Sequence, residues 1–109
     1  MTTPLPGKPV RGSTTGRPIM ALLDLLGRRW TLRVIWELRD EAAAPTFRDL
    51  QARCGGVSSS VLSARLRELT AAGVVEHPGD GYRLSKIGRD LLGRLEPLDE
   101  WASHWHPNE

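Results

Sequence analysis

Apolar side chains recur along this chain at the spacing of amphipathic helices. Within residues 18–27, which begin with proline and end with glycine, they fall at i, i+3, i+4 and i+7: Ile19, Leu22, Leu23 and Leu26. Met20 and Leu25 widen this stripe beyond what the core of one small domain needs, which suggests contact with a partner. Residues 30–39 repeat the spacing and predict a second helix.

The middle of the chain predicts two short helices joined by a tight turn. Thr46 is followed three residues later by Asp49, a pair that resembles a capping box, and Gly55-Gly56 ends the helix that it begins. Ser58 then caps a helix that ends at Gly73 in a Schellman motif and whose apolar seam is Leu62, Leu66 and Leu69. Two helices joined in this way are the helix-turn-helix pattern.

The remaining segments complete a recognisable order. Residues 40–45 suit a short edge strand or a turn, because Pro45 cannot donate to a sheet. Residues 74–85 predict a hairpin around the turn 78–81, and Ser85 caps a last helix with apolar positions Ile87, Leu91, Leu95, Leu98 and Trp105. We therefore expect a mainly α (α+β) fold, a winged helix-turn-helix with a short β-hairpin wing.

Length and composition indicate one domain preceded by a basic arm. At 109 residues with 39% hydrophobic residues, it has room for one domain of ordinary globular composition. The net charge is only +2, yet the basic residues Lys8, Arg11 and Arg17 all precede the first acid. Residues 1–17 are rich in Pro and Gly, which predicts a flexible basic arm, followed by the winged-helix domain over residues 18–109.

The single cysteine and the absence of long apolar runs favour a cytoplasmic protein. Cys54 has no partner for an internal disulfide, which agrees with a reducing compartment. Charged residues interrupt every candidate membrane span, and Pro and Gly break up the N-terminal segment where a signal peptide would need an apolar core. We expect no membrane association.

The helix after Ser58 has the features of a DNA-recognition helix. At about 100° per residue, its three leucines face inward and leave a polar, basic outer side. An ordinary solvated helix face is the alternative, but the complete helix-turn-helix and hairpin around it favour DNA. The predicted DNA contacts, including those from the preceding helix and the wing, are Ser58, Ser59, Ser60, Ser63, Ala64, Arg65, Arg67, Arg48 and Arg83.

Four stretches resemble the bacterial HxlR-type winged-helix regulators, a branch related to the MarR group. They are LDLLGRRWTLRVIWELRD (23–40), TFRDLQ (46–51), VSSSVLSARLRELTAAGVVE (57–76) and GYRLSKIGRDLL (81–92). The resemblance implies a homodimer built from the first and last helices that binds a pseudo-palindromic operator, usually as a repressor. The expected interface residues are Ile19, Leu22, Leu23, Leu95, Leu98, Trp101 and Trp105.

Three features depart from the family pattern. Many members carry a redox-sensing cysteine just before the first helix, where this chain has Gly16-Arg17-Pro18. The wing here is shorter and less basic than usual, so we expect few wing contacts. At Ser60 and Ala64 the family often has longer polar residues, which predicts a different operator preference.

Other chemistry is weakly supported. Cys54 lies on an apolar helix face, which favours a core residue over a sensor thiol. His77, His104 and His106 lack further residues at metal-ligand spacing, and Ser58–Ser60 lack the setting of a nucleophile. We expect no cofactor, no metal and no enzymatic activity. Two alternatives stay open: a small hydrophobic effector between helices, and a winged helix that docks a protein partner instead of DNA.

Overall fold

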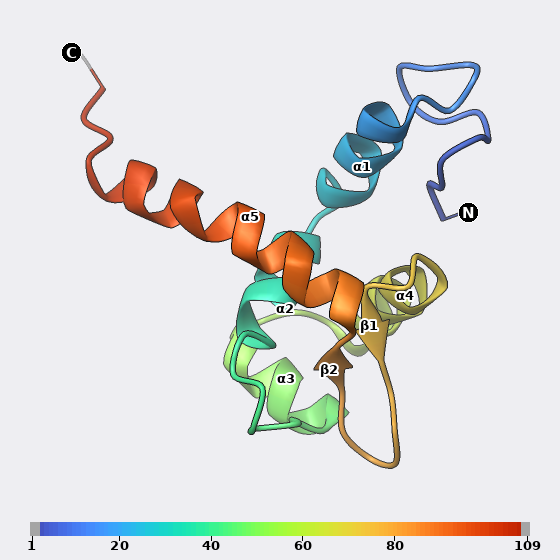
Figure 1. The fold of residues 1–109 in the computed structure, drawn as a ribbon. Coiled ribbons are helices and arrows are strands. Elements are labelled where there is room, and N and C mark those ends of the chain that lie inside the picture. Colours follow the sequence, from blue (N-terminus) through green and yellow to red (C-terminus); the bar gives the residue numbers. More distant parts are fainter. Residues whose placement is uncertain (1–2, 108–109) are drawn as a thin grey trace.

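The computed structural model describes residues 3–107 and has the expected winged-helix order. Two antiparallel strands form the wing, with Val75 paired to Leu84 and Glu76 to Arg83. Figure 1 shows the last helix crossing above the helix-turn-helix and the hairpin. The elements are α1 (Pro18–Leu26), α2 (Thr31–Glu37), α3 (Phe47–Cys54), α4 (Ser59–Ala71), β1 (Val75–Glu76), β2 (Arg83–Leu84) and α5 (Lys86–Ser103).

The segment before α3 is a turn and not a strand. Of the two forms that the sequence allowed for residues 40–45, the structure has turns at 41–43, and Ala44 adopts a positive φ of 37°. The backbone N–H of Tyr82 donates to the Pro45 carbonyl at 2.8 Å. Pro45 has no backbone N–H with which to donate a hydrogen bond to the hairpin. The pairing therefore does not extend into a third strand. The second helix is also shorter than expected, because α2 ends at Glu37.

Local capping signals account for the helix boundaries. Thr46 and Asp49 form the complete capping box at the start of α3, with bonds of 3.0 and 3.2 Å. The α4 helix ends in the predicted Schellman motif: Gly73 has a φ of 77°, and the N–H of Val74 donates to the Leu69 carbonyl at 2.9 Å. These side chains and one glycine fix where the helix-turn-helix begins and ends.

The hydrophobic core lies between α2, α3, α4, the hairpin and the first half of α5. The leucine seam of α4 is buried as predicted, at Leu62, Leu66 and Leu69. The buried side of α5 differs from the expected one, because Ile87 is 67% exposed while Leu92 is buried beside Gly88. The expected apolar pattern omitted Gly88, since a glycine carries no apolar side chain to reveal the face that packs.

Gly88 lies at a close junction between α5, the hairpin and the end of α4. A Cβ atom at this position would lie 2.1 Å from the Val74 carbonyl oxygen. Ser85, which caps α5 by accepting from the Gly88 N–H at 3.0 Å, donates its hydroxyl to the Gly73 carbonyl. The backbone N–H of Ser85 also donates to the Val74 carbonyl at 2.9 Å. The start of α5 is therefore bonded directly to the end of α4.

A buried carboxylate joins α4 to the loop after α1. Glu68 is 7% exposed and pairs with Arg28 from the α1–α2 loop and with Arg65, whose Nε lies 3.0 Å from Glu68 Oε1. The Arg65 guanidinium also donates to the Arg29 carbonyl at 3.4 Å. A carboxylate is stable in such a setting only when cations and hydrogen bonds offset its lost hydration. We call these three side chains the Glu68 clamp.

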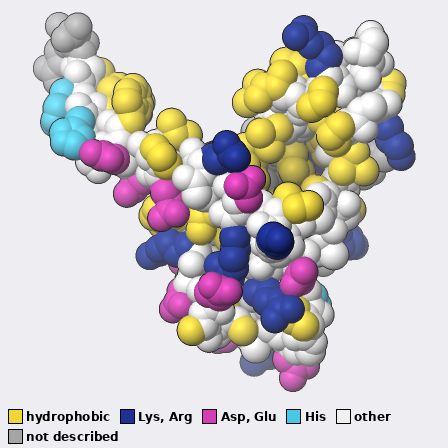
Figure 2. Space-filling view, in the orientation of Figure 1, with side chains coloured by type: hydrophobic (Ala, Val, Ile, Leu, Met, Phe, Trp, Pro, Cys, Tyr) yellow, Lys and Arg dark blue, Asp and Glu magenta, His cyan; other side chains and the backbone are white. Residues whose placement is uncertain are grey.

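Two elements project from the body of the molecule. Figure 1 shows α1 and the C-terminal half of α5 diverging like the arms of a V, and Figure 2 shows apolar side chains on both arms. Among residues 3–107, no helix is long and apolar enough to cross a membrane. The exposed large apolar side chains on these arms are Ile19, Leu23, Leu98, Trp101 and Trp105.

The described part of the N-terminal arm, residues 3–17, folds into a loop next to α1. The Gly7 N–H donates to the Gly16 carbonyl at 2.9 Å, and the Arg11 N–H donates to the Asp24 carboxylate at 3.3 Å. Pro4 and Gly16 are buried. The predicted flexibility of this arm stays a prediction, although these contacts give it a defined place beside α1.

The Gly88 junction predicts a large effect from one methyl group. We expect Gly88→Ala to lower the free energy of unfolding by about 2 kcal/mol, because the new Cβ overlaps the Val74 carbonyl. Gly93→Ala on the same helix is the matched control: a Cβ there meets no atom within 4 Å, so it should stabilise by about 0.5–1 kcal/mol. Urea unfolding of both variants at one protein concentration measures this. Equal effects would contradict the close packing of α5.

The Glu68 clamp predicts unequal roles for two neighbouring arginines. Arg28→Ala leaves a largely buried carboxylate with one cation fewer, so we expect a loss of about 2 kcal/mol in unfolding free energy. Arg29→Ala removes an exposed side chain and should change stability by less than about 0.5 kcal/mol. Thermal or urea unfolding of the pair separates the two. A neutral Arg28→Ala would show that the clamp contributes nothing to stability.

Candidate nucleic-acid interface

The outer side of α4 is polar and accessible from its first residue. Ser58 caps the helix by accepting from the Val61 N–H at 3.2 Å, and the inward leucines hold the opposite side against the core. Ser60 and Arg67 are exposed, while Ser63 and Ala64 are half-buried beside them. Short side chains at the start of the helix allow its backbone to approach a surface closely, and Arg67 extends beyond them.

The turn that orients α4 against α3 is held by side-chain hydrogen bonds. The Gln51 amide donates to the Ser59 hydroxyl at 3.0 Å and to the Val57 carbonyl at 3.3 Å. The Ser58 and Ser60 hydroxyls lie 3.3 Å apart. Ser59, expected as a DNA contact, is therefore already bonded within the turn. Gln51 is a positioning residue that the sequence reasoning did not single out, since a glutamine on a short helix carries no specific signal.

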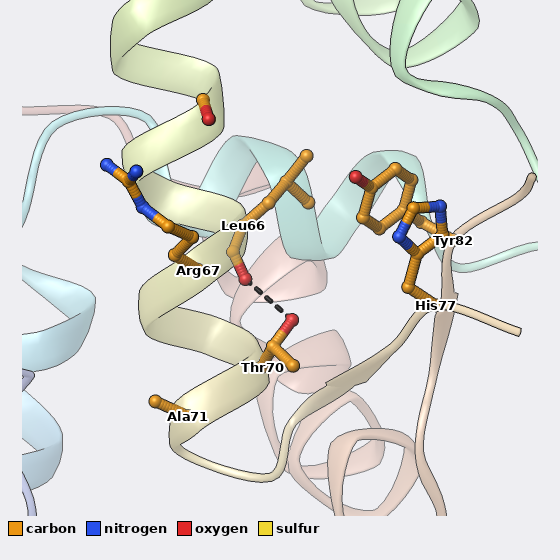
Figure 3. Close-up of a pocket in the computed structure, with 7 residues that line it drawn as sticks. Leu66, Arg67, Thr70, Ala71, His77 and Tyr82 are labelled. Carbon is orange, nitrogen blue, oxygen red and sulfur yellow. Dashed lines mark hydrogen bonds between the residues drawn. The ribbon is translucent and has the colours of Figure 1, made fainter.

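The two arginines of α4 have different environments. Arg65 was expected on the flank of the recognition surface, but its side chain is 15% exposed and its guanidinium is held in the Glu68 clamp. Arg67 is exposed and points away from the hairpin, as Figure 3 shows. Glu68 is the one acid within α4, and it faces inward. The outer side of α4 thus carries a positive charge without a carboxylate beside it.

The wing carries little unpaired charge. Arg83, the expected phosphate contact, pairs with Glu76 across the strands, with Nε and Oε2 2.9 Å apart. His77 stacks on Tyr82, with ring centroids 3.8 Å apart and planes 13° from parallel. Figure 3 shows this ring pair on the hairpin, facing α4 across a groove. The sequence did not indicate this stack, because it depends on how the hairpin closes.

Arg48 stands on the other side of the wing, in the first turn of α3. It is exposed and lines a shallow hollow with His77, Asp80 and Tyr82. The neighbouring acid, Asp49, accepts hydrogen bonds from the backbone and side chain of Thr46, and these bonds hold the pKa of its carboxyl below the usual value. Asp49 is thus engaged in the cap of α3.

Cys54 has the environment of a core residue. It is 2% exposed among the core side chains. Burial raises the pKa of its thiol above the ordinary value, outweighing the opposite influence of Arg33, while Glu37 adds to the rise. A buried thiol with a raised pKa has little thiolate at neutral pH and reacts slowly. The geometry agrees with the structural role expected from the sequence.

Comparison with known proteins places this interface in a family. Residues 25–109 match the family described as HxlR-like helix-turn-helix. The HTH-type transcriptional regulator BH0655 of Halalkalibacterium halodurans is 31% identical over 92 residues, covering 78% of this chain and 80% of that protein. YvaP of Bacillus subtilis, also an HTH-type transcriptional regulator, is 29% identical over 90 residues, covering 76% and 82%.

Two solved structures share the fold. The quinone-bound YodB from B. subtilis superposes with a TM-score of 0.73 at 26% identity, covering 80% of this chain and 97% of that one. An HxlR family transcriptional factor from Thermoplasma volcanium superposes with a TM-score of 0.69 at 32% identity, covering 75% and 78%. Both agree with the winged-helix order seen in Figure 1.

These matches and the exposed polar side of α4 lead to the same conclusion. The relatives are transcriptional regulators and not enzymes, and the helix-turn-helix that they share with this chain is a DNA-binding element. The chain belongs to the HxlR-like helix-turn-helix family and is a DNA-binding transcriptional regulator.

Proposed function

We propose that this protein binds a pseudo-palindromic operator as a homodimer, usually to repress transcription, with α4 of each protomer in the major groove. The observation that supports this most directly is the outer side of α4, where Arg67 and Ser60 are exposed and Glu68 is turned inward. The alternative of a winged helix that only docks proteins is not favoured, since the matched relatives are named as transcriptional regulators.

The predicted contacts divide into two groups by their environment. Ser60, Ser63, Ala64 and Arg67 lie on the outer side of α4, and the Arg67 guanidinium has the geometry to bind guanine or a phosphate through two hydrogen bonds. The other predicted residues support or flank this surface. They are Ser58 as the helix cap, Ser59 in the turn, Arg65 in the Glu68 clamp, and Arg48 and Arg83 as candidates for backbone phosphates.

The homodimer is supported by the apolar surface of the two projecting arms. Ile19 and Leu23 on α1 are each 54% exposed, and on α5 Leu98 is 58% and Trp101 60% exposed. Contiguous apolar surface of this kind usually marks a protein interface. The rings of Trp101 and Trp105 stack 5.4 Å apart, so they form one apolar surface. The remaining expected interface residues are Leu22 on α1 and Leu95 on α5, and both are half-buried.

A second copy packed on these arms would present two recognition helices to one face of the duplex. Half-sites read in this way lie about one helical turn apart, near 34 Å. The small hydrophobic effector stays a prediction. An apolar groove of about 270 Å³ between residues 4–6, α1 and α5 is open to such a ligand, and the similar protein YodB has been solved with a quinone bound.

Arg67 provides the first test of DNA binding. We expect Arg67→Ala to weaken binding to a duplex selected from a random library by about tenfold to a hundredfold, through loss of one two-bond contact per protomer. Arg94→Ala is the control, because it removes one positive charge from an exposed ion pair on α5. Fluorescence anisotropy between about 50 and 200 mM salt measures both. Equal affinities would remove Arg67 from the interface.

Leu98 provides the test of assembly. We expect Leu98→Asp to yield monomers and to lose most operator binding, because a charge buried in an apolar interface loses its hydration. Ala43→Asp adds the same charge in the exposed turn before α3 and should leave assembly unchanged. Light scattering coupled to gel filtration gives the mass of each. A dimeric Leu98→Asp protein would exclude this face of α5 from the interface.

A further inference from the structure

A groove lies between α4 and the wing, beside the helix that is proposed to enter the major groove. Its lining comes from Ser63, Leu66, Arg67 and Thr70 on α4 and from His77 and Tyr82 on the hairpin, around a volume of about 440 Å³ (Figure 3). If α4 occupies the major groove, the sugar–phosphate strand bordering that groove runs beside the helix. The hairpin stands on the same side, so this strand is led between α4 and the wing.

The polar groups on the walls of this groove differ in what they offer a phosphate, and the hydroxyls of Ser63 and Tyr82 are neutral donors. The Thr70 hydroxyl donates to the Leu66 carbonyl at 2.7 Å, so its proton is already engaged. The Arg67 guanidinium points away from the hairpin. Arg83 is paired with Glu76. On the wing side of the groove, the imidazole of His77 is the exposed group able to carry positive charge.

The His77 ring is held in place before any ligand arrives. It stacks on Tyr82 at 3.8 Å, and Tyr82 is itself half-buried and fixed through its backbone bond to Pro45. An exposed side chain normally loses rotamer entropy when it binds, and a stacked ring has already lost part of that freedom. The stack therefore favours His77 as a ligand-binding group over a freely moving side chain.

The charges around His77 come from several elements. Arg48 of α3 and Asp80 of the hairpin turn line the hollow behind it, and Glu76 of β1 is bonded to Arg83 of β2. Arg67 of α4 lines the groove, but its guanidinium is turned away from the hairpin. A phosphate placed in the groove brings negative charge to the imidazole. Such a charge favours the protonated ring, which can then donate a charge-assisted hydrogen bond.

We propose that His77 binds a backbone phosphate of duplex DNA in its protonated form, so that DNA affinity increases as the pH falls. This inference rests on the proposed function and adds a wing contact and a regulating variable to it. The sign follows from linkage: if the complex takes up a proton, a higher proton concentration favours the complex. Histidine is the side chain whose charge ordinarily changes between pH 5 and 8.

The test compares DNA affinity at about pH 6 and about pH 8 for the wild type and two variants. The probe is a labelled duplex selected by the wild-type protein at the higher pH. We expect the wild type to bind about tenfold more tightly at the lower pH. His77→Phe keeps an aromatic ring on Tyr82 but cannot be protonated, so it should lose most of this dependence. His104→Gln, on an exposed histidine after α5, should retain it.

The outcomes separate this inference from the function on which it rests. Retention of the full pH dependence by His77→Phe, or its loss in His104→Gln, would overturn the role of His77 while leaving the regulator intact. Failure of the wild type to bind any duplex at either pH would overturn the proposed function itself.

Discussion

The arrangement of the recognition surface depends on one buried carboxylate. Glu68 lies on the inward side of α4 and is neutralised by Arg28 from the α1–α2 loop and by Arg65 one turn earlier on the same helix. Hydrophobic packing of the leucine seam sets the depth of α4 against the core, but a leucine contact tolerates small rotations. The bonds from Glu68 to Arg28 and from Arg65 to the Arg29 carbonyl are directional, so they restrict how α4 is rotated about its axis.

The same interaction decides which positive charges remain available. The chain has many arginines, yet Arg28 and Arg65 are held by Glu68, and Arg83 is held by Glu76. Arg67 remains exposed on the side of α4 that faces away from the wing. A net charge of +2 therefore says little about DNA binding in this protein. The position of each cation relative to its nearest acid is more informative.

The sequence predicted local features well because their causes are local. The capping box at Thr46 and the Schellman turn at Gly73 each involve residues within a few positions of one another, and both are present. The seam of α4 was equally clear, since its leucines share one helical face. The winged-helix order followed from these elements, and the family comparison agrees with it.

The features that the sequence left out depend on distant partners. The inward turn of Arg65 requires Glu68 and the Arg29 carbonyl, which lies 36 positions earlier. The buried side of α5 was misjudged at Ile87, because the helix packs through Gly88, whose contribution is the absence of a side chain. The stack of His77 on Tyr82 follows from hairpin closure, and the fixed turn at Ser59 follows from Gln51. The sequence therefore predicted the outward face of α4 more reliably than the environment of its individual side chains.

The junction at Gly88 has a mechanical consequence for regulation. Backbone atoms of α5 and of the segment between α4 and β1 meet there without an intervening side chain, and Ser85 bonds to the Gly73 and Val74 carbonyls of that segment. A tilt of α5 at this junction would therefore move the start of the wing and the segment after α4 together.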